Sequence, residues 1–251
     1  MIIVKTDQEI ELMRLAGKIL AGAFDVAGPM MKPGTVARDV DRMVEEYIRA
    51  AGAVPAFKNY PNQNGNPFPG SVCFSIDAEV VHGIPAGQIL TEGTIIGLDI
   101  GVKFKGYYSD AARTYAIGQI DAPRQKLLDV TRHALDLGIA QAYAGNHLSN
   151  IGHAIQVYVE SHGCSVVRDL VGHGVGRRLH EDPQVPNYGE ANRGPILRKN
   201  MTLAIEPMIN LGTHEVDMIG EWQVLTRDRK PSAHFEHTVV VTDTEAEILT
   251  L

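Results

Sequence analysis

Four acidic residues lie in segments whose other residues are mostly apolar and β-forming, and this placement limits the folds that the chain can adopt. Asp99 follows Ile95-Ile96-Gly97-Leu98, and Glu206 follows Leu203-Ala204-Ile205. Burying a carboxylate without a partner is costly, so a core excludes such groups unless a cation compensates them. With one histidine, the four acids carry a formal charge of −4, which two divalent cations would cancel. The set is Asp99, Asp110, His173, Glu206 and Glu236, and it predicts a two-metal hydrolase.

The first two acids fall in a predicted β-hairpin. Two β-runs, at about 94–102 and 107–115, are joined by Lys103-Phe104-Lys105-Gly106. A turn centred in the middle of this tetrapeptide makes Asp99 face Asp110 directly. Directly opposed residues have Cβ atoms about 4.5–5.5 Å apart, and two like charges at that distance repel each other unless a cation lies between them. The hairpin alone therefore favours a metal site.

The first half of the chain begins with two predicted helices. Thr6 and Glu9 form a capping box for a helix at residues 7–27. Thr35 is expected to cap a second helix, which ends before Gly52. From position 71 onward the apolar period changes to two, which predicts strands.

The second half repeats this order of elements. Two helices are expected at about 122–143 and, after Ser149, at about 150–162. Strands are then expected at about 165–171, 202–210, 220–226 and 234–241. Two helices followed by strands, twice, predict an α+β fold with pseudo-two-fold symmetry. Because the candidate ligands come from both halves, we expect the site in a cleft between them.

The composition limits the class of protein. With 44% apolar and 21% charged residues, the chain suits one soluble globular domain that spans residues 1–251. A net charge of −7 disfavours a dedicated nucleic-acid binder. The charged N-terminal segment excludes a signal peptide, and the uncharged run at 137–159 is too polar for a membrane span. Two cysteines are too few for a disulfide framework. We therefore expect a cytoplasmic protein.

The other three candidate ligands are ambiguous one at a time. His173 lies in the glycine-rich stretch 172–176, which suits either a close approach to a ligand or a flexible loop with incidental histidines. Glu206 interrupts an apolar strand predicted at 201–209, where a structural ion pair is the alternative. Glu236 lies near the start of a β-run, where an exposed position is the alternative. Only the complete set favours a metal centre.

Five ordered motifs, spread over nearly the whole chain, resemble one known family. They are Glu79-Val80-Val81-His82-Gly83-Ile84-Pro85, the Asp99 and Asp110 pair, the two-histidine segment 172–183, Met201-Thr202-Leu203-Ala204-Ile205-Glu206-Pro207, and Glu236-His237-Thr238. By these motifs the chain is similar to type I methionine aminopeptidases of the short bacterial form, which are pita-bread metallopeptidases. The resemblance implies a pseudo-two-fold antiparallel β-sheet core with two pairs of flanking helices. It also implies removal of the initiator methionine from nascent chains with a small second residue, by attack of a water or hydroxide that bridges two metals.

The resemblance also implies a role for each ligand. Asp99 would be a bidentate ligand of one metal, Asp110 and Glu236 would bridge both, and His173 and Glu206 would complete the other. Glu206 would also carry a proton from the attacking water to the leaving amine. A carboxylate-rich site with one imidazole suits Mn²⁺, Fe²⁺, Co²⁺ or Zn²⁺, so the identity of the two ions stays open.

Two further histidines resemble catalytic residues of the family. His180 would donate a hydrogen bond to the scissile carbonyl oxygen, and His82 would contact the scissile amide nitrogen or orient the substrate. With Glu206 they form the predicted catalytic set. The remaining histidines are expected to be mostly solvated or structural, and strand alternation turns His237 away from Glu236. They are His133, His147, His153, His162, His214, His234 and His237.

An apolar pocket for the methionine side chain follows from the resemblance. The chain departs from the family here, because seven residues separate Tyr60 from Phe68 where about two are expected, and Leu179 replaces a common aromatic. The loop at 61–67, within a region expected to be a mobile surface loop, could then lie over the pocket mouth. The expected pocket residues are Tyr60, Phe68, Cys73, His82, Leu179, His180 and Trp222, with Phe57 as an uncertain member.

One alternative is another enzyme of the same fold, and a second belongs to a different functional class. An X-Pro peptidase of the same fold shares the metal ligands, but such enzymes usually have an additional N-terminal domain, for which His82 lies too near the start of the chain. A metal-free ribosome- or RNA-binding paralogue would lose ligands, whereas all five are present. The expected partners are N-terminal methionine peptides and nascent chains, with a transient ribosome contact, no membrane contact and a monomeric state.

Overall fold

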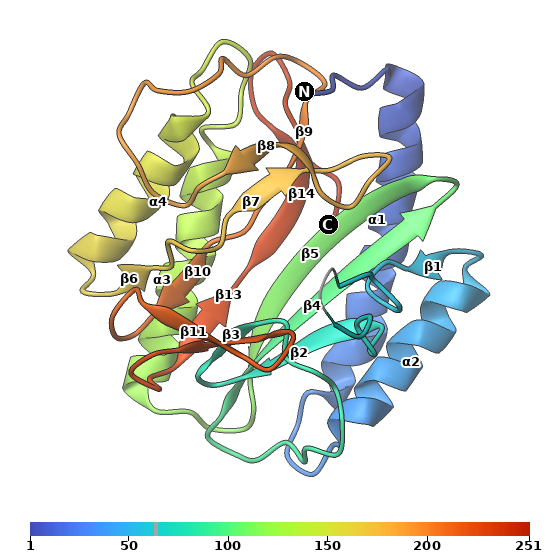
Figure 1. Cartoon of the computed structure of the whole chain (residues 1–251), viewed down its shortest axis with the longest axis vertical. Coiled ribbons are helices and arrows are strands. Elements are labelled where there is room, and N and C mark those ends of the chain that lie inside the picture. Colours follow the sequence, from blue (N-terminus) through green and yellow to red (C-terminus); the bar gives the residue numbers. More distant parts are fainter. Residues whose placement is uncertain (63–64) are drawn as a thin grey trace.

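A twisted antiparallel sheet runs through the centre of the molecule (Figure 1). The computed structural model describes residues 1–62 and 65–251, and nine strands of this part form the sheet. The main order is β1 (Val54–Pro55), β4 (Ile95–Phe104), β5 (Tyr107–Ala116), β14 (Glu236–Val240), β9 (Thr202–Ile205), β7 (Gly172–Gly174) and β8 (Glu181–Val185). Off this path, β2 (Val72–Ile76) pairs with β4, and β15 (Glu247–Ile248) pairs with β14.

Two small sheets adjoin the large one. The first has the order β13 (Ser232–His234), β10 (Met208–Asn210) and β6 (Ser165–Val166). The second has the order β11 (Val216–Ile219), β12 (Gln223–Thr226) and β3 (Glu79–Val81). Every pairing in both small sheets is antiparallel.

The helices form two pairs, as the repeated order of elements predicts. The first pair is α1 (Asp7–Ala27) and α2 (Ala37–Ala50), with a short 3₁₀ turn, η1 (Gly28–Met30), between them. The second pair is α3 (Ala122–Ile139) and α4 (Ser149–Ser161). In Figure 1 the first pair lies beside β4 and β5, and the second pair lies on the other side of the molecule. α3 ends earlier than expected, because residues 140 and 141 form a turn and Tyr143 forms an isolated β-bridge with Thr242.

The predicted helix caps have mixed outcomes. The capping box is confirmed, since the Thr6 side chain accepts from Glu9 N and the Glu9 carboxylate accepts from Thr6 N. The Thr35 cap is wrong, because Val36 occupies the cap position of α2 without a side-chain hydrogen bond. The backbone carbonyl of Thr35 instead accepts a hydrogen bond from Leu90 N.

Each pair of helices has its own core. The core of the first half joins α1 and α2 to β2, β4 and β5 through residues such as Leu20, Ile48 and Leu98. The core of the second half joins α3 and α4 to β9 and β14 through residues such as Leu203 and Val239. The structure thus has the pseudo-two-fold α+β architecture that the sequence predicts.

The β4–β5 hairpin is present, but its predicted register is wrong by two residues. Asp99 pairs with Ala112, and Asp110 pairs with Gly101. The turn consists of Lys105 and Gly106, whose φ angles of 47° and 88° are both positive. This is the conformation of a two-residue type I′ hairpin turn, in which glycine is strongly preferred at the second position. A shift of two keeps both acids on one face, where they are diagonal rather than direct neighbours.

The strand predicted at 202–210 is two strands in two different sheets. β9 belongs to the central sheet and β10 to a small one, and Glu206-Pro207 lies between them. Proline has no N–H to donate to a ladder, so the chain leaves the central sheet at this point. The run predicted at 234–241 divides in the same way at Phe235, between β13 and β14.

The other second-half strands differ from their expected ranges. The run predicted at 165–171 forms only β6, and the following glycine-rich stretch contributes β7. The run predicted at 220–226 is β12, which forms a hairpin with β11. The region 53–70 is mostly loop, apart from β1, as expected.

The loop at 61–67 falls partly outside the described residues, because 63 and 64 do not belong to them. Of the rest, Asn62 Nδ2 donates to Glu221 O at 3.1 Å, and Asn66 N donates to the Glu221 carboxylate at 3.1 Å. The described part of the loop therefore contacts the β11–β12 turn. Within residues 1–62 and 65–251, every helix is too short or too polar to cross a membrane.

Candidate metal centre

Strand alternation directs the first-half acids away from the helices. In β4, Leu98 and Ile100 belong to the core under α1 and α2, so Asp99 between them projects from the opposite face. In β5, Ala111 belongs to the same core, so Asp110 also projects from the opposite face.

The second-half ligands approach the same face of the sheet. Glu236 pairs with Ala112 of β5, the residue that pairs with Asp99 on its other side. His173 in β7 pairs with Ala204 of β9. These pairings join strands of both halves around one cluster of carboxylates.

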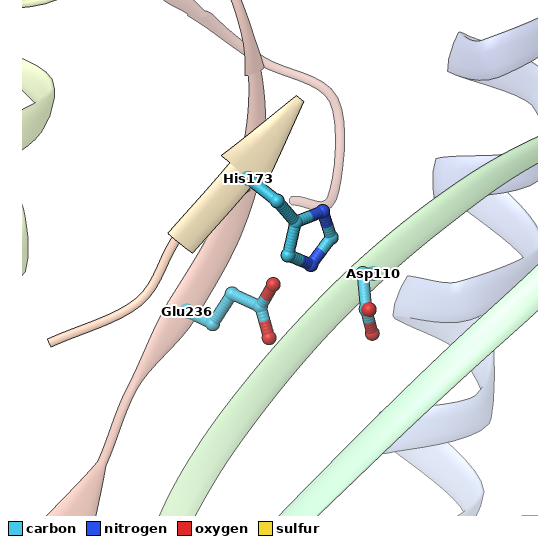
Figure 2. A group of neighbouring side chains, drawn as sticks. All are labelled: Asp110, His173 and Glu236. Carbon is cyan, nitrogen blue, oxygen red and sulfur yellow. The ribbon is translucent and has the colours of Figure 1, made fainter. Parts of the chain in front are cut away.

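The side chains form two overlapping groups of candidate ligands. Asp110, His173 and Glu236 offer one atom each, all within 4.8 Å of one another, and Figure 2 shows these side chains pointing toward one another. Glu206, His234 and Glu236 form a second group within the same limit. Glu236 belongs to both groups, so the groups are contiguous.

Burial without counter-charge dominates the electrostatics of the four acids Asp99, Asp110, Glu206 and Glu236, which we call the acid cluster. Burial, followed by the neighbouring carboxylates, raises the pKa of Asp99, Glu206 and Glu236 well above the usual range. Burial raises the pKa of Asp110 to about 7. Such groups hold protons unless positive charge is supplied, so cation binding here releases protons.

Several buried polar atoms at the acid cluster lack hydrogen-bond partners, and their chemistry fits a divalent cation. Among residues 1–62 and 65–251, six buried side-chain N or O atoms have no hydrogen-bond partner. Four of them belong to this site: Asp99 Oδ1, Asp110 Oδ1, Glu236 Oε1 and His234 Nε2. Buried polar atoms normally have a hydrogen-bond partner. Four such atoms without one at the same place therefore indicate a missing partner. Carboxylate and imidazole donors suit the divalent ions of the first transition series.

The orientation of His173 is fixed by its backbone. Its Nδ1 lies 2.8 Å from Gly174 O, so Nδ1 carries the proton and donates to this carbonyl oxygen. Nε2 then has a free lone pair, and it lies 3.6 Å from Glu206 Oε1. Burial, followed by His180, lowers the pKa of His173 to about 3, which keeps the ring neutral and able to bind a metal.

Hydrogen bonds from neighbouring elements fix the backbone of two acids. Thr238 Oγ1 accepts from Asp110 N at 2.9 Å and donates to Asp110 O at 2.8 Å. Asn187 Nδ2 donates to Glu206 O at 2.9 Å. These contacts hold the two main chains while leaving both carboxylates free for other partners.

An apolar cavity of about 140 Å³ adjoins the acid cluster. This volume is close to the roughly 150 Å³ that holds a benzene ring, so it accommodates one side chain. Phe57, which was the uncertain member of the expected pocket, lines the cavity, and all five candidate ligands line it too. The expected pocket residues that line it are Tyr60, Phe68, Cys73, His82, Leu179, His180 and Trp222.

The two non-ligand histidines lie at the edge of this cavity. Tyr60 Oη and His180 Nδ1 are 2.7 Å apart, and burial lowers the pKa of His180. His82 has a φ of 60°, which is unusual for a residue other than glycine. Burial, followed by His180, lowers the pKa of His82 to about 4. Both rings are therefore neutral near pH 7.

Sequence reasoning left one nearby residue outside the site. His234 is only 3% exposed, and its Nε2 lies 3.5 Å from Glu206 Oε2. Its position two residues before Glu236 suggests a shared face, but the break at Phe235 removes the simple alternation that would have supported this inference. His237, by contrast, contacts Thr250 through Nδ1 at 2.8 Å, on the other side of β14.

Comparisons with known proteins identify the family of the chain. The model of metallopeptidase family M24 matches residues 11–243. Methionine aminopeptidase 1 of Bacillus subtilis is 48% identical over 100% of this chain and 99% of its own length. The crystal structure of methionine aminopeptidase from Thermotoga maritima has a TM-score of 0.95 and 44% identity, and the match covers 100% of this chain and 99% of that one. The prolidase from Pyrococcus furiosus has a TM-score of 0.79 at 23% identity and shows the fold alone.

The fold is therefore the pita-bread fold of metallopeptidases, and the candidate ligands line a cavity to which both halves of the chain contribute. The chain belongs to metallopeptidase family M24. Within that family, its full-length similarity is to methionine aminopeptidases.

Proposed function

We propose that this protein is a metal-dependent methionine aminopeptidase, which removes the initiator methionine from proteins with a small second residue. One observation carries the proposal: the cavity of about 140 Å³ is lined both by residues of one apolar cluster and by the five candidate ligands. A methionine side chain in this cavity would place its own peptide bond beside the acid cluster. The full-length relatives named methionine aminopeptidase support the same activity.

Asp99, Asp110, His173, Glu206 and Glu236 would hold two divalent cations. Asp99 would bind one ion, Asp110 and Glu236 would bridge both, and His173 and Glu206 would complete the other. When bound, the cations lower the pKa of water and polarise the scissile carbonyl group. Mn²⁺, Fe²⁺, Co²⁺ and Zn²⁺ all suit this donor set.

Glu206 is suited to move the proton of the reaction. Its backbone is held by Asn187, whereas its carboxylate lies between two imidazoles. In the metal-free protein, burial raises the pKa of this carboxylate well above the usual range. It accepts a proton from the attacking water and delivers it to the leaving amine.

His180 would stabilise the charge that develops on the carbonyl oxygen. When Tyr60 O–H donates to Nδ1, the ring proton must reside on Nε2, which then donates to that oxygen. His82 lies across the same cavity and would contact the scissile nitrogen or orient the substrate.

The free amino group of the substrate accounts for exopeptidase specificity. A free amino group would bind at an open position of the metal centre, whereas an internal peptide bond offers no such donor. The metal centre would thus favour binding of a chain terminus.

The whole chain would act as one catalytic domain, because Asp99 and Asp110 come from the first half and the other ligands from the second. We further propose a cytoplasmic location, a monomeric state, and transient ribosome contact during synthesis of the substrates. The X-Pro alternative is less well supported, since the prolidase shares only the fold and this chain covers 65% of it.

A peptide panel tests the proposed function. Met-Xaa peptides with varied Xaa should be cleaved fastest when Xaa is small, after anaerobic loading with Mn²⁺, Fe²⁺, Co²⁺ or Zn²⁺. Glu206→Gln should retain part of the metal but lose most of the turnover. Failure of every metal to bind or activate the protein would overturn the proposal, and preferential cleavage before proline would favour the X-Pro alternative.

A further inference from the structure

His234 lies at the end of β13, held in place through its main chain. Its N–H donates to Thr114 Oγ1 at 2.9 Å, and Thr114 Oγ1 donates to His234 O at 2.7 Å. The residue also pairs with Met208 of β10. The ring thus extends from a fixed backbone, and its side chain is only 4% exposed.

The imidazole Nε2 of His234 lies close to two carboxylates without a hydrogen bond to either. It lies 3.5 Å from Glu206 Oε2 and 4.0 Å from Glu236 Oε2. It is also one of the buried atoms without a partner. Both separations are long for an N–H···O hydrogen bond, whose usual range ends at about 3.2 Å.

The same separations match those of two ligands on one cation. Donor atoms about 2.1 Å from an ion, at angles between roughly 90° and 145°, lie about 3.0–4.0 Å from each other. His173 shows the same relation on the other side, with Nε2 3.6 Å from Glu206 Oε1. Each oxygen of the Glu206 carboxylate therefore has an imidazole nitrogen beside it.

We propose that His234 is a sixth ligand of the metal centre, which binds through Nε2 the ion that Glu206 and Glu236 hold. The inference rests on the proposed metal centre and adds a donor to it. Together with His173, the centre as a whole would then have two imidazole ligands instead of one. Imidazole favours Co²⁺, Fe²⁺ and Zn²⁺, whereas carboxylate-rich sites suit Mn²⁺. His234 thus sets which metal the centre prefers.

Titration of the metal-free protein with Co²⁺ and with Mn²⁺ tests this role without an activity assay. His234→Gln keeps a polar side chain that can donate a hydrogen bond to Glu206 but removes the imidazole. We expect at least about a tenfold loss of Co²⁺ affinity, against less than about threefold for Mn²⁺. We also expect a shift of the Co²⁺ visible absorption bands, because a nitrogen donor is lost.

His237→Gln is the matched control, since it removes a histidine from the neighbouring strand whose ring contacts Thr250. It should leave the affinity and the Co²⁺ spectrum unchanged. His234→Asn provides a second variant if the glutamine variant does not fold, as judged by circular dichroism. Unchanged Co²⁺ affinity and spectrum in a folded His234 variant would overturn the inference alone. Absence of Co²⁺ and Mn²⁺ binding by the wild-type protein would instead overturn the metal centre itself.

Discussion

Buried acids occur in two neighbouring places in this molecule, and their surroundings differ. The Glu181 side chain is 1% exposed, and its Oε2 accepts from Lys5 Nζ at 2.7 Å while its Oε1 accepts from Arg178 N at 3.1 Å. Asp110 and Glu236 are buried as deeply, yet each has an oxygen without any partner. The fold therefore pairs Glu181, a buried carboxylate with a structural role, with a cationic side chain of its own, Lys5. Where it supplies none, the carboxylates indicate a ligand from outside the chain.

The largest expected effect is on the acid cluster. Asp110→Ala and Glu236→Ala should each lower kcat/KM for a methionine peptide by on the order of 10³, equivalent to about 4 kcal/mol of transition-state stabilisation. The cause would be loss of metal, which elemental analysis of the purified variants measures. Glu190→Ala, which alters an exposed acid paired with Arg193, is the control and should stay within about twofold. Normal activity in a metal-depleted Asp110→Ala sample would contradict the ligand assignment.

The next largest effect is a loss of stability when Glu181 loses its partner Lys5. Lys5→Met leaves Glu181 buried without its cation and should lower the free energy of unfolding by about 3–5 kcal/mol. Chemical denaturation of the metal-free protein measures this loss. Lys199→Met is a suitable control, because its pair with Asp243 is exposed and contributes little to stability. A Lys5→Met protein as stable as the control would remove the contrast between the two kinds of acid.

The smallest effect is a pH dependence confined to the acid cluster. In the metal-free protein the pKa of Asp110 is raised to about 7, above the 3.8 of the free side chain. The folded state therefore keeps a proton that the unfolded state loses, so this contribution to stability is full below pH 4 and is lost as the pH rises to about 7. Asp110→Asn cannot ionise, so it should gain stability relative to wild type from pH 5 to pH 8.

Thermal unfolding with a chelator present measures this difference. The melting temperature of the variant relative to wild type should increase by at least about 2 °C across that range, or roughly 1 kcal/mol. Added Mn²⁺ or Co²⁺ should reverse the order by stabilising only the wild type strongly. A constant difference between the two proteins at every pH would show that Asp110 is already ionised in the metal-free fold.

The sequence predicted the elements and the convergence of the acids better than their exact pairing. Helix periodicity and the Thr6–Glu9 capping box located α1, because these signals are local. The hairpin register depended on choosing which two residues turn, and Gly106, with its positive φ, was the signal that would have corrected it. The change of sheet at Glu206-Pro207 could be suspected from the proline, but its direction depends on packing against other strands.

In the site, too, the sequence predicted which residues come together better than it predicted their exact positions. The five candidate ligands and the pocket residues converge on one cavity, as the family resemblance implied. His234 was missed because its position depends on the break at Phe235 and on the hydrogen bonds with Thr114, neither of which a periodic pattern reveals. Contacts between segments distant in sequence decide such positions.

Trp222 gives the cavity its own optical probe. It is the single tryptophan of the chain, it lines the cavity, and its indole N–H donates to Asn66 O at 3.1 Å. All tryptophan fluorescence therefore originates beside the position proposed for the methionine side chain. Changes in its emission would report entry of a ligand without a label, and stopped-flow mixing could separate the binding step from peptide cleavage.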